Sequence, residues 1–197
     1  MSTLPTEQHW EENVILADAD WMDRFVFELT VNFERMLERA LPKAQLAQWM
    51  DYLALDGGLR PGNNKVQVLL IHSAGKKTLK NCIPSSLTDD LDGKAFSDNL
   101  GEFLFSAFPV ETELVDKGQF FAESLKTLAE APSVKRLLVV PDVERYGQEL
   151  KDTLRKAQDK NITLFATEPV ANYHCKQEIL TYSAMATLGI RGEELPR

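Results

Sequence analysis

The stretch "NVILADADWMDRF" (Asn13–Phe25) changes from an apolar run into a cluster of acids. Its first residues are apolar and β-branched, which predicts a buried strand. Asp18, Asp20 and Asp23 then follow within six positions. Over Trp21–Ala40 the apolar residues recur at helical spacing. The stretch therefore predicts a strand that ends in carboxylates and leads directly into a helix.

The rest of the chain repeats this alternation of apolar runs and helical patterns. Strands are expected at Asn13–Ala19, Lys65–Ser73, Gly101–Val115, Val134–Asp142 and Asn161–Pro169, and helices at Trp21–Ala40, Pro42–Leu55, near Ser85–Leu91, and at Lys117–Ala131, Val143–Lys160 and Cys175–Ile190. Continuously apolar strands between helices predict a mostly parallel sheet covered on both faces. We therefore expect a Rossmann-like, three-layer α/β domain with about five strands, in which ligands bind at the carboxyl ends of the strands.

Length and composition predict one soluble domain. The 197 residues suit a single domain, 1–197, with a polar N-terminal extension at 1–12 and a loose tail at 191–197. The chain has no apolar run of membrane-spanning length, its first residues do not resemble a secretory signal, and its two cysteines have no metal or disulfide spacing. We expect a cytoplasmic protein without a membrane partner. The net charge of −8 argues against broad, non-specific DNA binding.

Acids at two strand ends are the strongest functional signal. Asp18 and Asp20 end the first strand, and Asp142 ends the fourth, with Glu144 two residues later. If these strands are neighbours, the acids meet at one edge of the sheet, and a hard cation such as Mg²⁺ or Mn²⁺ would relieve their repulsion. This hypothesis makes Asp18 and Asp142 the metal ligands. The alternative is that the acids only cap the helices that follow them.

Several segments resemble the successive elements of the PIN/NYN nuclease superfamily: "VILADADW" (Val14–Trp21), "FFAESLKTL" (Phe120–Leu128) and "LLVVPDVERYGQELKDTLRKAQDKNITLF" (Leu137–Phe165). The chain is also similar to a bacterial family of unknown function that carries "LADADW", "LDGGLR", "DNLGEF" and "GIRGEEL". The nuclease resemblance implies metal-dependent RNA cleavage by the four acids Asp18, Asp20, Asp142 and Glu144, or a non-catalytic descendant that binds RNA or protein. Phe120 and Lys126 stand where that superfamily has acids in its middle helix.

Two other functions fit the same residues. "VILADAD" also resembles the start of the haloacid-dehalogenase phosphohydrolases, which implies Asp18 as the nucleophile and Asp20 as the general acid and base, with Lys76 or Lys77 as the charge-balancing lysine. The other alternative is a non-enzymatic interaction protein, whose partner is a second protein or a further copy of the chain.

Two further segments, at the end of the second predicted strand and within the third, each allow two interpretations. His72 and Ser73 end the second strand, where His72 is either a general acid and base or a side chain satisfied by a backbone carbonyl. Phe103, Phe105 and Phe108 form either a base-stacking surface or a strand packed in the core. The glycines of Ala54–Asn64 lack the order of a dinucleotide loop, so we expect no nucleotide cofactor.

Overall fold

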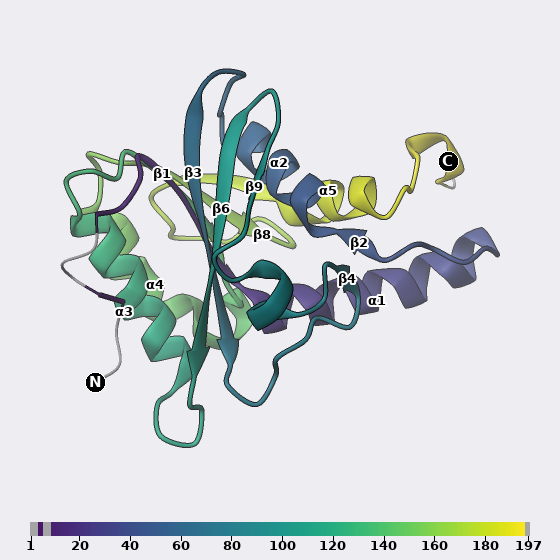
Figure 1. The fold of residues 1–197 in the computed structure, drawn as a ribbon, viewed down its shortest axis with the longest axis horizontal. Coiled ribbons are helices and arrows are strands. Elements are labelled where there is room, and N and C mark those ends of the chain that lie inside the picture. The colour runs from purple at the N-terminus through teal and green to yellow at the C-terminus, as the bar shows by residue number, and fades with distance from the viewer. Residues whose placement is uncertain (1–3, 6–8, 196–197) are drawn as a thin grey trace.

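A seven-stranded sheet forms the centre of the molecule, with the strand order β5-β6-β3-β1-β7-β8-β9 (Figure 1). This computed structural model describes residues 4–5 and 9–195 of the chain. The strands of this sheet are β1 (Asn13–Asp18), β3 (Asn64–Ser73), β5 (Ala95–Ser97), β6 (Gly101–Val110), β7 (Arg136–Val140), β8 (Asn161–Ala166) and β9 (Lys176–Ile179). Neighbouring strands pair in parallel except β5, which is antiparallel to β6.

Strand β1 lies in the middle of the sheet, between β3 and β7. Its residue Ala17 is level with Leu70 of β3 and with Val140 of β7, so the three carboxyl ends meet at one edge. The first and fourth predicted strands are therefore neighbours, which is the condition for their acids to meet at one edge. The chain passes from β1 to β3 and β6 on one side and then returns to β7 on the other, so the strand order reverses between β1 and β7. In α/β sheets this reversal is the usual place for a ligand.

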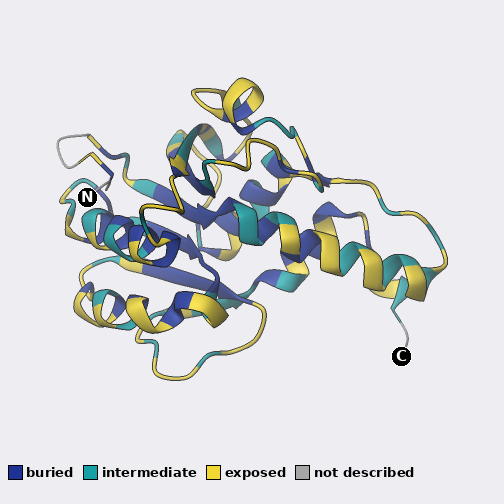
Figure 2. Cartoon of the chain, turned by 90° about the horizontal axis from the view of Figure 1, so that it is seen from below, coloured by how far each residue is buried: buried dark blue, intermediate teal, exposed yellow. Residues whose placement is uncertain are grey.

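Helices cover both faces of the sheet, as expected, and each face has its own hydrophobic cluster. Helices α1 (Ala19–Leu37), α2 (Leu46–Asp56) and α5 (Leu180–Thr187) pack on one face, and α3 (Lys117–Glu130) and α4 (Val143–Lys156) on the other. Figure 1 shows these groups on opposite sides of the strands, and Figure 2 shows buried strands beneath helices with exposed outer sides. Because side chains alternate along β1, Asp18 points to the same face as Val14 and Leu16, towards α3 and α4.

Three of the helices begin at an aspartate that follows a strand or a loop. Asp18, Asp116 and Asp142 each accept a hydrogen bond from a backbone N–H in the first turn of α1, α3 and α4, respectively. Such caps satisfy an N–H group that has no partner within its own helix. Helix α1 is followed by Glu38, whose φ of 53° places it in the left-handed region and ends the helix. These local signals explain why the helix starts lie within a few residues of the predicted positions.

The sheet has more strands than the sequence predicts. Strand β9 lies inside the segment Cys175–Ile190, which was expected to be wholly helical, so α5 begins only at Leu180. Strand β5 extends the opposite edge as a hairpin with β6, which ends at Val110. These segments form strands because they pair with other strands of the sheet. The local sequence pattern does not reveal such pairing.

A small parallel sheet of β2 (Ala44–Gln45) and β4 (Cys82–Ile83) lies outside the main one. Because β2 uses residues after Pro42, α2 begins at Leu46 and not at Pro42 as predicted. A five-residue π-helical turn, η1 (Leu87–Leu91), stands where a short helix was expected.

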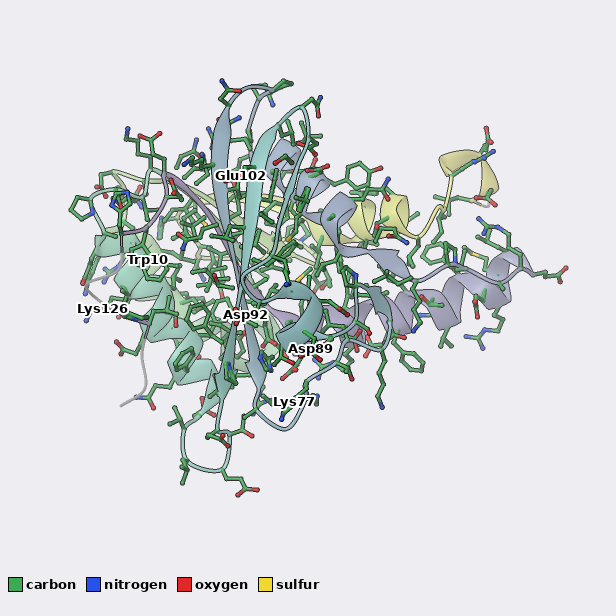
Figure 3. All side chains as sticks on the ribbon, in the orientation of Figure 1. Trp10, Lys77, Asp89, Asp92, Glu102 and Lys126 are labelled. Atoms are coloured by element: carbon green, nitrogen blue, oxygen red, sulfur yellow. The ribbon has the colours of Figure 1, made fainter. Side chains whose placement is uncertain are left out.

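The ends of the described chain are attached to the body. Leu4 and Trp10, from the expected N-terminal extension, are buried in the cluster beneath α3 and α4, and Figure 3 shows Trp10 beside α3. In the expected loose tail, Gly192–Glu194 form a 3-10 turn, η2, and Glu194 pairs with Arg39 at 2.9 Å. Residues 1–3, 6–8 and 196–197, which belong to the same two predicted segments, lie outside the described residues.

Candidate functional site

Asp18, the last residue of β1, is fully buried at the edge where the strand order reverses. Its Oδ1 accepts hydrogen bonds from the backbone N–H of Trp21 at 3.0 Å and from Lys117 Nζ at 2.8 Å. Its Oδ2 accepts one from the hydroxyl of Tyr146 at 2.8 Å. Both oxygens are therefore already engaged by groups of the chain itself.

Asp20 lies in the first turn of α1 and joins β1 to the end of β3. Its Oδ2 accepts hydrogen bonds from the backbone N–H of Ser73 at 2.9 Å and the Ser73 hydroxyl at 2.6 Å, and from Lys117 Nζ at 3.0 Å. Burial alone would raise the pKa of Asp20, but the hydrogen bonds from Ser73 and the Lys117 charge outweigh it and hold that pKa below its ordinary value. Asp20 is therefore a carboxylate at neutral pH.

Lys117 bridges the two acids from the start of α3. Only 6% of its side chain is exposed, and its Nζ contacts both carboxylates. Asp116 fixes the start of the helix by accepting a hydrogen bond from the N–H of Gln119 at 2.9 Å. Gly118 lets α3 approach α4 closely, because a Cβ there would lie 2.7 Å from the Cβ of Tyr146. The ammonium group thus has a fixed position between the acids.

Tyr146 of α4 links the ends of β1 and β7. Its hydroxyl donates to Asp18 and accepts a hydrogen bond from the backbone N–H of Asp142 at 3.1 Å. Burial and the Asp18 charge both raise the pKa of Tyr146, so the phenol keeps its proton and remains the donor. The Asp142 side chain turns elsewhere: one oxygen caps α4 through the N–H of Arg145, and the other accepts a hydrogen bond from Arg24 at 3.0 Å.

The structure places the residues proposed from the sequence in different surroundings. These residues are Asp18, Asp20, His72, Ser73, Asp142 and Glu144. Asp18, Asp20 and Ser73 meet around Lys117, which we call the acid–lysine cluster. Glu144 is exposed in the first turn of α4. His72 is buried, and its Nδ1 lies 3.0 Å from the backbone oxygen of Ser73, as in the second of the two interpretations of this histidine.

The aromatic strand belongs to the core. Phe103 and Phe105 are 0% and 4% exposed, and their rings lie 4.7 Å and 5.9 Å from the ring of Phe96, measured between centroids. Phe108 is partly buried against the opposite cluster. The packing interpretation of these phenylalanines therefore agrees with the structure, and the surface available for stacking bases is small.

The acids do not fit a metal ion in this arrangement. The ammonium of Lys117 stands between Asp18 and Asp20, where a cation would sit, and the Asp142 carboxylate is used by Arg24 and by its own helix. Over residues 4–5 and 9–195, no three side chains of His, Cys, Asp or Glu gather in a way that could hold an ion. A divalent ion would have to displace Lys117 to reach Asp18 and Asp20.

Comparison with known proteins places the chain in a family. The model of a family of unknown function, DUF6621, matches residues 7–195. The chain belongs to this family. No curated protein and no solved structure matches the chain at a significant level. The relationship of DUF6621 to the PIN/NYN superfamily therefore stays a prediction, as does the assignment of its sheet to a particular Rossmann-like fold family.

The described helices of this DUF6621 member include none that is both long enough and apolar enough to cross a membrane.

Three residues that sequence reasoning missed complete the site: Lys117, Tyr146 and Arg24. The segment Asp116-Lys117-Gly118 carries only a local signal, because its cap predicts the start of α3 but does not relate Lys117 to the distant end of β1.

Proposed function

We propose that this member of DUF6621 is a non-enzymatic binding protein, in which the strand-end acids stabilise the fold. The observation that carries the proposal is the position of Lys117, whose Nζ lies 2.8 Å from Asp18 and 3.0 Å from Asp20. The ammonium supplies the positive charge that the acids require, and it does so from within the chain. The cluster then needs neither a metal ion nor a substrate.

Burial of the cluster supports the same conclusion. The side chains of Asp18, Asp20 and Lys117 are 0%, 6% and 6% exposed, so the acids offer very little surface to a phosphodiester in the solvent. Catalysis by nucleophilic attack from Asp18 would require access to a carboxylate whose two oxygens already accept three hydrogen bonds. The buried and occupied oxygens of Asp18 are unfavourable for the phosphohydrolase alternative and for metal-dependent RNA cleavage. The position of Lys117 beside both acids, by contrast, is what the phosphohydrolase resemblance implies for a charge-balancing lysine.

A solution experiment tests the proposal. Wild-type protein is incubated with a labelled single-stranded RNA and Mn²⁺, and its thermal unfolding is measured with and without the ion. We expect no cleavage and no saturable stabilisation. The proposal is wrong if the wild type cleaves the RNA, if Asp20→Asn and Asp142→Asn abolish that cleavage, and if the exposed control Glu149→Gln still cleaves. Such results would show that the protein is a metal-dependent nuclease.

A further inference from the structure

A crevice lies beside the acid–lysine cluster, at the point where the strand order reverses. It is lined by Trp21, Arg24 and Glu28 of α1, by Val143 and Glu144 of α4, and by Thr167 just after β8. Because α1 and α4 cover opposite faces of the sheet, the loops after β1 and β7 diverge and leave this space between them. Its volume of about 410 Å³ is that of a small-molecule site.

Among the described residues that line the crevice, Arg24 is the one cationic side chain, and it is already paired. Arg24 Nη2 donates to Asp142 at 3.0 Å, and Arg24 Nε lies 3.9 Å from Glu28 in the next turn of the same helix. The Arg24 side chain, 57% exposed, therefore reaches from α1 towards the start of α4. Since two carboxylates surround the guanidinium, little of its charge is available to an anionic ligand.

The electrostatic balance of the crevice is negative. Glu28 and Glu144 oppose the single charge of Arg24, which leaves a net charge of −1 at its walls. Asp142, which pairs with Arg24 from outside the lining, adds a second negative charge beside them. The acid–lysine cluster beside it adds one further negative charge, because its two carboxylates share one ammonium. A field of one sign in a concave site concentrates ligands of the opposite charge and repels phosphates.

Trp21 gives the crevice an aromatic wall. Its ring stacks on Phe25 with parallel planes, 5.3 Å between centroids, and this contact fixes its orientation. An indole ring beside carboxylates attracts organic cations, because the ring face is electron-rich and the apolar part of such a ligand loses contact with water. A hydrated metal ion gains much less from this wall than an alkylammonium or guanidinium group.

We propose that the crevice binds a small organic cation, an amine or guanidinium compound, with its charge between Glu28 and Glu144 and its carbon skeleton against Trp21. This inference rests on the proposed function and deepens it by naming the class of ligand. The ligand binds without a chemical change, since the side chains that line the crevice hold and orient it. Anionic nucleotides and inorganic phosphate are excluded by the same charges.

The test is calorimetric titration of the full chain in EDTA with agmatine, spermidine and choline, and with inorganic phosphate as the anionic probe. We expect saturable binding of at least one cation and no binding of phosphate. The double substitution Glu28→Gln and Glu144→Gln should weaken that binding about tenfold or more. Both side chains are exposed, so the variant should fold normally.

Glu149→Gln, on an exposed part of α4 outside the crevice, is the matched control and should bind like the wild type. The inference is overturned if none of the three cations binds at concentrations up to about 10 mM, a very weak affinity. It is equally overturned if phosphate binds, if the double variant binds as tightly as wild type, or if the control weakens binding as much. Because EDTA removes divalent ions, these results are independent of the Mn²⁺ experiment that tests the proposed function.

Discussion

Two pairs of aspartates in this chain are neutralised in different ways. Asp18 and Asp20 share the ammonium of Lys117 in a buried cluster. Asp51 of α2 and Asp98, in the turn before β6, interact with each other instead. Burial and Asp98 raise the pKa of Asp51 to about 7, and one Asp51 oxygen is buried without a partner among the described residues.

The comparison shows two ways to compensate a pair of carboxylates: a lysine ammonium that is part of the chain, and a bound proton whose presence depends on pH. Burial works to raise the pKa of Asp98, but the interaction with Asp51 and the hydrogen bond from the N–H of Leu100 outweigh it and lower that pKa. The pair therefore carries one proton between its two carboxyls at mildly acidic pH and loses it near neutrality. The acid–lysine cluster has instead a cation that belongs to the chain, because the Lys117 ammonium contacts both carboxylates.

The largest expected effect follows from removing Lys117. Lys117→Met leaves two buried carboxylates without a cation, and we expect a loss of about 3–5 kcal/mol in the free energy of unfolding. Urea unfolding at neutral pH measures it. Lys126→Met, at an exposed position of the same helix (Figure 3), is the control and should cost less than about 0.5 kcal/mol.

A second substitution checks that charge is the cause. Asp20→Asn in the Lys117→Met background removes one of the two uncompensated charges and should recover part of the lost stability. If Lys117→Met costs no more than Lys126→Met, the ammonium is not what stabilises this cluster.

Loss of the Tyr146 hydroxyl should have the next largest effect. Tyr146→Phe leaves Asp18 Oδ2 and the N–H of Asp142 without their partner, and a buried unpaired group costs about 1–3 kcal/mol. The control is Tyr182→Phe, whose side chain is largely exposed and should be neutral. Equal stability of the two variants, measured by urea unfolding, would contradict the role given to this hydroxyl.

The Asp51–Asp98 pair predicts a dependence of stability on pH. The folded chain holds a proton on Asp51 up to about pH 7, whereas the unfolded chain releases it near pH 4. Stability from this pair therefore falls as the pH rises from about 4 to about 7 and is constant above that.

Asp51→Asn should remove this fall. It should also stabilise the protein at pH 8 by on the order of 1 kcal/mol, a figure discounted because the pair lies near solvent. Thermal unfolding over a series of pH values measures the slope, with the exposed Asp159→Asn as control. An unchanged slope in Asp51→Asn would mean that the proton is not held at this pair.

The smallest effect is expected at the pair of Arg24 and Asp142, in which the arginine is exposed and the carboxylate is buried. Because the Arg24 side chain is 57% exposed, Arg24→Gln should change the free energy of unfolding by about 1 kcal/mol or less. Arg155→Gln, which breaks a pair exposed on both sides, should behave similarly in the same unfolding measurement. A much larger loss for Arg24→Gln would show that this contact, too, is part of the buried cluster.

The sequence was sufficient for elements whose cause is local. The apolar run of β1, the caps Asp18 and Asp142, and the helical spacing of α1 predict these elements to within a few residues. The sequence does not predict strand β9, because its pairing with β8 determines it. Its residues lie directly before α5, so the local pattern reads as one helix. The extra strand therefore required the tertiary structure.

The candidate site was predicted only in part. The sequence brought Asp18, Asp20 and Ser73 to one edge, because the ends of neighbouring parallel strands meet. Lys117 contacts Asp18 across 99 positions of sequence, and no periodicity relates a helix start to a distant strand end. Asp51 and Asp98 are hidden for the same reason, since two aspartates in different elements carry no sign of their proximity.

The central claim is that Lys117 occupies the cation position of the strand-end acids. A crystal structure of the wild-type protein soaked in Mn²⁺, with anomalous data, tests it most directly. The account predicts no anomalous peak between Asp18 and Asp20, and Lys117 Nζ within hydrogen-bond distance of both carboxylates. A Mn²⁺ ion bound by Asp18 and Asp142, with the Lys117 side chain displaced, would contradict it.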